Sequence, residues 1–159
     1  MKLFQTKNAL LSVLVLSMML IPTLRAETVD GEQASLYDRL GGLAPITVVV
    51  SDFLDELVPD PLLNQNPAID AARQAVPKPY LKYQVTAMVC QATGGPCEYH
   101  GRNMKAAHAH LNITEREWAR MVVIFKDLLA RHQVPEQETN ELLAIIDSTK
   151  SDIVMASSP

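Results

Sequence analysis

Residues 94–111 read GGPCEYHGRNMKAAHAHL, and this stretch decides how the rest of the chain is interpreted. The Gly-Gly-Pro of residues 94–96 favours the end of one helix, because glycine terminates helices and proline cannot continue them. In the helix expected after this turn, Met104, His108 and Leu111 share one face at steps of four and seven residues. The stretch therefore predicts a helix end, a turn, and a short helix that carries one imidazole on its apolar face.

The neighbouring histidines are expected in other places. His110 would lie about 200° around the same helix from His108, given about 100° per residue, so it points elsewhere. His110, His100 and His132 are all expected to face solvent. A neutral imidazole nitrogen can bind a metal, but a lone helical histidine is more often an ordinary surface or core residue. On spacing alone, His108 is only a candidate ligand.

Apolar residues recur at three- and four-residue steps on both sides of this stretch, and no segment alternates like a half-buried strand. One such run covers residues 46–57 and ends before Pro59. A second covers residues 118–129 and follows a capping box formed by Thr114 and Glu117. These runs predict two amphipathic helices.

Two more helices are expected from the same pattern. One extends from Pro79 or Tyr80 to Ala92. The other opens at Pro135, and its apolar face carries Leu142, Ile145, Ile146 and Ile153. Together with the short helix that holds His108, they predict an all-α chain.

The motifs Gly-Gly-Pro-x-x-Tyr-x-Gly, at residues 94–101, and Met-Lys-x-x-His, at residues 104–108, are typical of one family. With them, the chain from about Ser35 to Val154 resembles the group I truncated haemoglobins. The resemblance implies a truncated globin fold in a domain of residues 35–155, in which two antiparallel helix pairs form a two-over-two sandwich around haem b. Periodicity alone indicates the helices but not this arrangement.

The resemblance also implies the residues of the site. His108 falls on the proximal position, which ligates the haem iron and is the one expected metal ligand. Tyr80 and Gln84 match positions on the distal side, and Tyr83 shares their helix; Tyr83 could equally place its hydroxyl in water. The other expected haem contacts are apolar and could also serve as plain core: Phe53, Met88, Met104, Trp118, Met121 and Phe125.

Three cations could bind the haem propionates, which need positive charge or solvent at the pocket rim. They are Lys78, Arg102 and Lys105, and each could equally belong to a solvated face.

The chain departs from the family pattern at two positions. Leu54 follows Phe53 where many members have a ligand-binding tyrosine, and leucine cannot donate a hydrogen bond. Asn66 aligns best with a phenylalanine that normally wedges against the haem. The departure at Asn66 predicts haem that is held more loosely or differently.

The first residues predict an export signal. Lys2 and Lys7 precede an apolar run of residues 9–22, and cleavage is expected after Ala26. The alternative is a membrane anchor, but a spanning helix needs about 20 apolar residues. Residues 27–34 are expected to form a flexible lead-in, and residues 156–159 a disordered tail.

Charge and export together limit the partners. Loss of three basic residues and no acidic ones with the leader would change the net charge from −4 to −7. Nucleic acids and anionic membranes are therefore not expected partners, because both attract basic proteins. We expect a periplasmic monomer.

Cys90 and Cys97 can form a disulfide if the chain is exported to an oxidising compartment, where the bridge would hold the Gly-Gly-Pro turn. The alternative is one buried and one free thiol. The sequence contains no Cys-x-x-Cys-His motif for covalent attachment of c-type haem.

The leading functional hypothesis is an exported b-type haem protein that reversibly binds oxygen or nitric oxide. Oxygen transport and nitric oxide detoxification are both open; detoxification would be a dioxygenase-type activity and would need a separate electron donor. The second hypothesis is a periplasmic haem peroxidase or nitrite reductase. The third is a degenerate globin that binds no haem and acts as an interaction module, which Asn66 favours.

Overall fold

The computed structural model describes residues 34–155, and within that range the regular elements are all helical. The predicted leader, the lead-in up to residue 33 and the tail of residues 156–159 lie outside the described residues. The elements in chain order are α1 (Leu36–Arg39), α2 (Leu43–Leu57), the 3-10 turn η1 (Leu63–Gln65), α3 (Pro67–Ala75), α4 (Lys78–Ala92), α5 (Met104–His108), α6 (Glu115–Arg131), α7 (Glu136–Ser148) and α8 (Lys150–Ile153).

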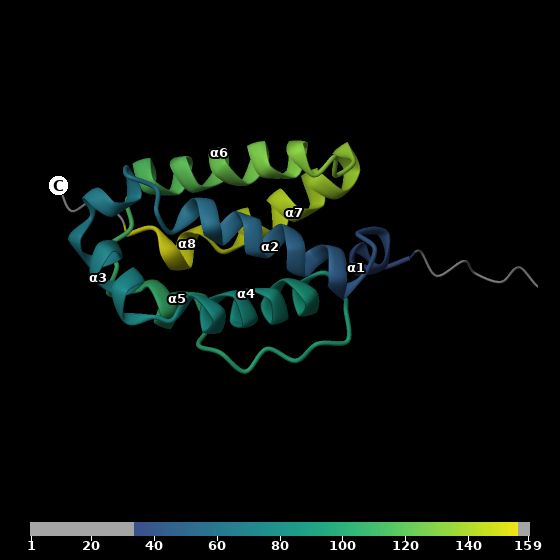
Figure 1. Cartoon of the computed structure of the whole chain (residues 1–159), viewed down its shortest axis with the longest axis horizontal. Helices are drawn as coiled ribbons and strands as arrows, with labels where there is room; N and C mark the ends of the chain where they lie inside the picture. Colours follow the sequence, from purple (N-terminus) through teal and green to yellow (C-terminus); the bar gives the residue numbers. More distant parts are fainter. Residues whose placement is uncertain (1–33, 156–159) are drawn as a thin grey trace, which may run out of the picture. The chain divides into compact units, whose positions relative to one another are not determined.

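The long helices form two pairs, α2 with α4 and α6 with α7. Helix α2 contacts both α4 and α6, and Figure 1 shows it lying between them. Helix α7 packs against α6, because Leu142 belongs to the same buried cluster as Phe125 and Leu129. The predicted all-α, two-over-two arrangement is confirmed.

Two apolar clusters hold the pairs together. Leu36, Phe125, Leu129 and Leu142 form one, and a second on α2 is packed by apolar side chains of α4. Leu129 is completely buried. Burial of one such leucine contributes about 1.5–3 kcal/mol, and α6 buries more residues than any other helix of the described range, Leu128 and Phe125 among them.

The predicted start of α6 is confirmed, and the predicted final helix is wrong in one respect. Thr114 and Glu117 form the full capping box at the start of α6. After Pro135, the helix ends at Ser148, and Ile153 lies on the separate short helix α8. The hydroxyls of Ser148 and Thr149 donate to carbonyls of the preceding turn, at 2.6 and 2.7 Å. Such side-chain bonds compete with helical ones and end α7 there.

A buried carboxylate fixes the corner between α2 and η1. The Asp60 side chain accepts hydrogen bonds from the amides of Leu62 and Leu63, at 3.0 and 3.1 Å, and from the guanidinium of Arg120 on α6, at 2.8 and 3.0 Å. Burial opposes the charge of Asp60, but these donors outweigh it and lower the pKa of the carboxyl. The corner is thereby tied to α6, just before α3 begins.

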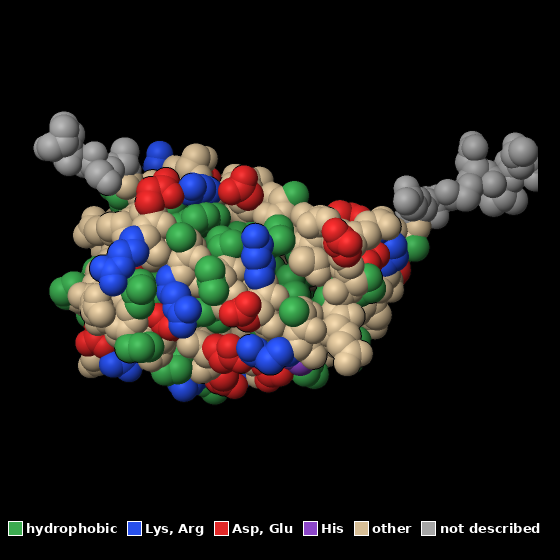
Figure 2. All heavy atoms as spheres, turned by 90° about the horizontal axis from the view of Figure 1, so that it is seen from above, with side chains coloured by type: hydrophobic (Ala, Val, Ile, Leu, Met, Phe, Trp, Pro, Cys, Tyr) green, Lys and Arg blue, Asp and Glu red, His purple; other side chains and the backbone are tan. Residues whose placement is uncertain are grey.

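The surface of the helical unit carries both signs of charge. Figure 2 shows acidic and basic side chains interspersed over one face, with single apolar side chains between them. The visible face therefore presents no patch of one sign.

No helix of residues 34–155 is long and apolar enough to cross a membrane.

Candidate functional site

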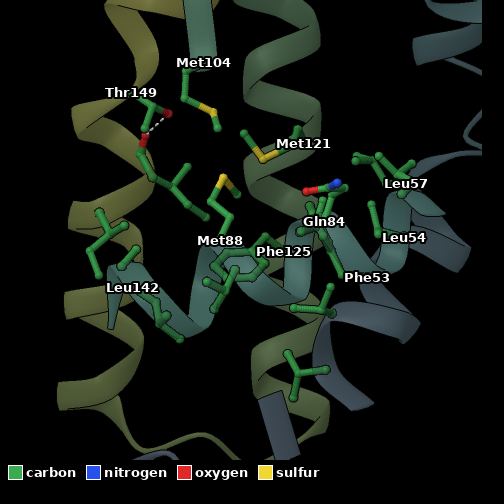
Figure 3. A pocket seen from close by; sticks show the side chains of 18 of the residues that line it. Phe53, Leu54, Leu57, Gln84, Met88, Met104, Met121, Phe125, Leu142 and Thr149 are labelled. Carbon is green, nitrogen blue, oxygen red and sulfur yellow. Dashed lines mark hydrogen bonds between the residues drawn. The ribbon is translucent and has the colours of Figure 1, made fainter. Parts of the chain in front are cut away.

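The helices enclose a cavity of about 1030 Å³. That volume lies at the upper end of the range for small-molecule and cofactor sites. Most of the lining side chains are apolar, and Figure 3 shows the thioethers of Met88, Met104 and Met121 turned into the pocket. These three residues come from α4, α5 and α6, so three separate helices contribute polarisable, adaptable side chains to one wall.

His108 is the last residue of α5, and it brings the imidazole of that helix to the cavity. Its Nδ1 lies 2.8 Å from the carbonyl oxygen of Met104. A carbonyl can only accept, so Nδ1 carries the proton and the lone pair is on Nε2. Burial lowers the pKa of His108; the Met104 carbonyl opposes this shift, and the charges of His110 and Arg102 add to it. The ring is therefore held as a neutral imidazole with one fixed tautomer, the form that binds a metal.

His110 also borders the cavity, but its side chain is exposed. Helix α5 ends at His108, so His110 lies in the turn beyond it rather than on a helical face. The expected solvent exposure is confirmed for His110 and His100 and is wrong for His132, which is half-buried, lines the cavity and lies 3.0 Å from a carboxylate oxygen of Asp52. No described residue fixes the ring of His110 as the Met104 carbonyl fixes His108.

Of the predicted contact residues, all except Tyr83 line the cavity. Phe53 and Phe125 meet edge to face, with ring centroids 5.2 Å apart and an angle of 72° between the planes. Trp118 is buried on the same helix as Phe125. These aromatic side chains give the cavity a rigid wall.

The polar residues of α4 differ in depth. The Gln84 side chain is half-buried and points into the pocket (Figure 3), and no residue in the described range 34–155 hydrogen-bonds to its amide. Tyr80 is 56% exposed at the cavity edge, whereas Tyr83 is 67% exposed and does not reach the cavity. Leu54 is buried in the wall. The amide of Gln84 is thus the best placed donor on α4.

Asn66 does not line the cavity. Its Oδ1 accepts from the amides of Ala68 and Ile69 at the start of α3, at 3.0 and 3.5 Å, and its Nδ2 donates to the carbonyl of Leu111, at 2.8 Å. Leu63, from the preceding turn η1, is buried in the wall instead. Asn66, which stands where the family has a phenylalanine, therefore links two segments of the backbone, and its substitution leaves no gap in the cavity wall.

Helix α3 contributes Ile69, Ala72 and Arg73 to the cavity, and sequence reasoning did not predict it. The signal was present, since Asn66 and Pro67 are favourable residues for the cap and first turn of a helix.

Two of the three predicted rim cations line the cavity. Lys78 and Arg102 do so, whereas Lys105 does not. Within residues 34–155, neither Lys78 nor Arg102 forms an ion pair, in contrast to Arg73, which pairs with Asp70. Lys78 and Arg102 are thus available for an anionic group at the mouth of the cavity.

A disulfide pins the loop between α4 and α5. Cys90 and Cys97 are bonded, with Cα atoms 5.7 Å apart, as predicted. A Cβ at Gly95 would overlap the ring of Tyr37 and lie 2.7 Å from the Cys90 sulfur, so only glycine fits there. The Tyr99 amide donates to Gln91 of α4, at 2.6 Å. The loop is held against α4, and Tyr99 itself lines the cavity.

Residues 35–155 match the family of bacterial-like globins. The chain belongs to this family. A group 1 truncated hemoglobin of Mycolicibacterium paratuberculosis is 30% identical over 115 residues, which cover 72% of the chain and 80% of the relative. A group 1 truncated hemoglobin of Chlamydomonas moewusii is 26% identical over 125 residues, covering 76% of the chain and 68% of the relative.

Solved globin structures share the fold. The truncated hemoglobin of Tetrahymena pyriformis in its Fe(III) form superposes with a TM-score of 0.66 at 21% identity, covering 77% of this chain and all of that one. The 2/2 hemoglobin of Synechococcus sp. PCC 7002, in the cyanomet state with covalently attached heme, gives a TM-score of 0.65 at 22% identity, covering 76% and 98%. This globin therefore has the two-over-two fold that its sequence predicted.

Proposed function

We propose that this globin is a b-type haem protein that reversibly binds a diatomic gas, oxygen or nitric oxide, after export to the periplasm. The observation that carries the proposal is the state of His108, whose Nδ1 is engaged by Met104 and whose Nε2 remains free in the wall of a large apolar cavity. Haem, when bound, would supply the iron that binds the gas. The names of the relatives, and the heme named for the Synechococcus protein, support the assignment.

The chain's own residues fit this cofactor. The Met104 carbonyl orients the His108 ring and makes Nε2 a stronger base. The apolar wall built by Phe53, Trp118 and Phe125 excludes water from a flat hydrophobic group. At the mouth, Lys78 and Arg102 are placed to bind two carboxylates such as the propionates of haem.

The distal side offers one well-placed donor. A gas ligand that acquires partial negative charge is stabilised by a hydrogen bond, and the Gln84 amide is the donor that reaches into the pocket. Leu54 can offer none. Tyr80, at the exposed edge, is placed for a weaker contribution.

The same wall favours gas binding over peroxide chemistry. A peroxidase needs a distal acid–base group. In the described structure, α4 lines the cavity with Lys78, Tyr80, Gln84 and apolar residues; the arginines and histidines that line the cavity come from other segments of the chain. We therefore place oxygen binding, or nitric oxide detoxification with a separate electron donor, ahead of a peroxidase or nitrite reductase.

The test is the absorption spectrum of the mature protein after haem titration, reduction and addition of carbon monoxide. We expect a sharp Soret band from the parent and its loss in His108→Ala. His110→Ala is the matched control, because it removes a histidine that borders the same cavity, and it should leave the spectrum nearly unchanged. A parent without a Soret band would leave the haem-free interaction module as the better explanation, and reversed effects of the two variants would refute the ligand assignment.

Export is supported by the leader pattern and by the Cys90–Cys97 bridge, which is typical of oxidising compartments. Intact mass of the periplasmic product tests both. We expect a chain that begins at Glu27 and is two hydrogens lighter than its dithiol form. A full-length mass would argue against cleavage.

A further inference from the structure

The segment that carries His108 has little apolar support of its own. Helix α5 has five residues, and none of them is fully buried. Its first turn is capped by Asn103, whose Oδ1 accepts from the Ala106 amide at 2.8 Å. Beyond the helix, the Leu111 amide donates to the carbonyl of His108, also at 2.8 Å. Short polar bonds at its two ends therefore do much to fix this segment.

Asn66 supplies the bond that anchors the far end. Its Nδ2 donates to the Leu111 carbonyl across 45 positions of sequence, while its Oδ1 caps α3. Two consecutive hydrogen bonds thus connect Asn66 to His108, through the two sides of Leu111. Leu111 itself lines the cavity, so a shift of this residue changes the wall as well as the helix end.

We propose that Asn66 is a positioning residue for His108, acting as a polar clip that fastens the end of the α5 segment to the start of α3. This rests on the proposed function only in that His108 is taken as the ligand. The clip offers a physical reason for a polar residue at this position: the side chain turns away from the cavity and holds the peptide that follows the ligand.

The two roles of Asn66 can be separated by substitution. Asn66→Asp and Asn66→Ser keep an oxygen that can cap α3, because aspartate and serine are as favourable as asparagine at that position. Neither can donate to the Leu111 carbonyl as Nδ2 does: the carboxylate has no proton, and the serine side chain is shorter. The matched control is Gln65→Glu, which makes the same amide-to-carboxylate change at the exposed neighbouring residue, whose Oε1 accepts from Arg116.

Two measurements on haem-loaded protein report on the ligand. The first is the iron–histidine stretching band in the resonance Raman spectrum of the reduced, ligand-free form; the second is the rate of haem transfer to excess apomyoglobin. We expect Asn66→Asp and Asn66→Ser to shift or broaden the band and to speed haem loss about threefold to tenfold, the range for one lost hydrogen bond. Gln65→Glu should keep the parental band.

A third measurement needs no haem. Hydrogen exchange of the Leu111 amide in the apoprotein should be faster by a similar factor in Asn66→Asp and Asn66→Ser than in Gln65→Glu. A parental Raman band together with unchanged Leu111 exchange in both Asn66 variants would overturn the clip. If the parent took up no haem, the proposed function would fail, and the exchange of Leu111 would still decide whether the clip exists.

Discussion

Helices α4 and α5 both line the cavity, but they are held in different ways. Helix α4 has fifteen residues, buries Thr86 and Cys90, and packs Leu81, Val85 and Val89 against the cluster on α2. Helix α5 has five residues and depends on caps and hydrogen bonds, and among the helices of residues 34–155 its one extensive contact is with α8. The difference separates two tasks: the long helices supply the stability of the fold, and the short polar segment supplies the alignment of one imidazole.

This separation predicts that the largest losses of stability come from the bundle. Phe125→Ala removes a buried ring that packs against Phe53, and we expect the free energy of unfolding of the apoprotein to fall by about 3–5 kcal/mol. Asn66→Ala, which removes the α3 cap and the clip, should cost less, about 1–2 kcal/mol. Urea denaturation monitored by circular dichroism measures both.

The control is Val123→Ala on the same helix, since Val123 is 46% exposed. It should change the stability by no more than about 0.5 kcal/mol. If Asn66→Ala proved as costly as Phe125→Ala, the α5 segment would have to be counted as part of the core, and the contrast between the two helices would be lost.

The next effect concerns the distal donor on α4. Gln84→Leu should raise the oxygen dissociation rate of the haem-loaded protein by about ten- to a hundredfold, which corresponds to the loss of a hydrogen bond to a partly charged ligand. Tyr80→Phe should raise it less, because the ring is more than half exposed. Carbon monoxide release should change little, since its outer atom carries less charge. Stopped-flow dissociation gives all three rates.

Tyr83→Phe serves as the control on the same helix, because Tyr83 lies outside the cavity. A rate within about twofold of the parent is expected for it, well under the effect of one such bond. Equal rates for Gln84→Leu and Tyr83→Phe would show that Gln84 supplies no donor to the ligand.

The long helices could be predicted because their apolar residues repeat with the period of a helix. That pattern predicted α2, α4 and α6, and the capping box predicted where α6 begins. Helix α3 escaped prediction because Ile69 is its only large apolar side chain, so it has no apolar repeat, and none of its residues is buried. The end of α7 was missed because it depends on the hydroxyls of Ser148 and Thr149, which interrupt no apolar repeat.

The site residues also divide into those that could be predicted from the sequence and those that could not. The resemblance to the truncated haemoglobins implied most of the predicted residues that reach the cavity. Two predicted residues do not reach it: Tyr83, which is 67% exposed, and Lys105. The role of Asn66 could not be predicted, because its partner is a backbone carbonyl 45 residues away. A sequence does not show which backbone carbonyl a side chain will contact. From the sequence alone, Asn66 could therefore be recognised only as the absence of the expected phenylalanine.

The smallest expected effect is a pH dependence that arises from α5. Burial lowers the pKa of His108 below the ordinary value of 6.5. As the pH falls through 6.5, the unfolded chain therefore binds more protons at this residue than the folded one, and stability decreases. The loss ends below the folded-state pKa, where both forms are protonated. Helix α4 contains no histidine.

We expect the apoprotein to lose more stability between about pH 7.5 and pH 5 than His108→Gln, in which the residue cannot be protonated. His110→Gln keeps the buried imidazole and should follow the parent, because His110 is exposed. Urea denaturation of the three proteins at the two pH values measures the difference. The other histidines contribute equally to the pH dependence of parent and variant, so their contributions cancel in the comparison. A parent and a His108→Gln variant with the same pH dependence would mean that the imidazole is not buried in the apoprotein. In that case haem binding itself, and not the Met104 carbonyl and the Asn66 clip, would have to bring His108 into place.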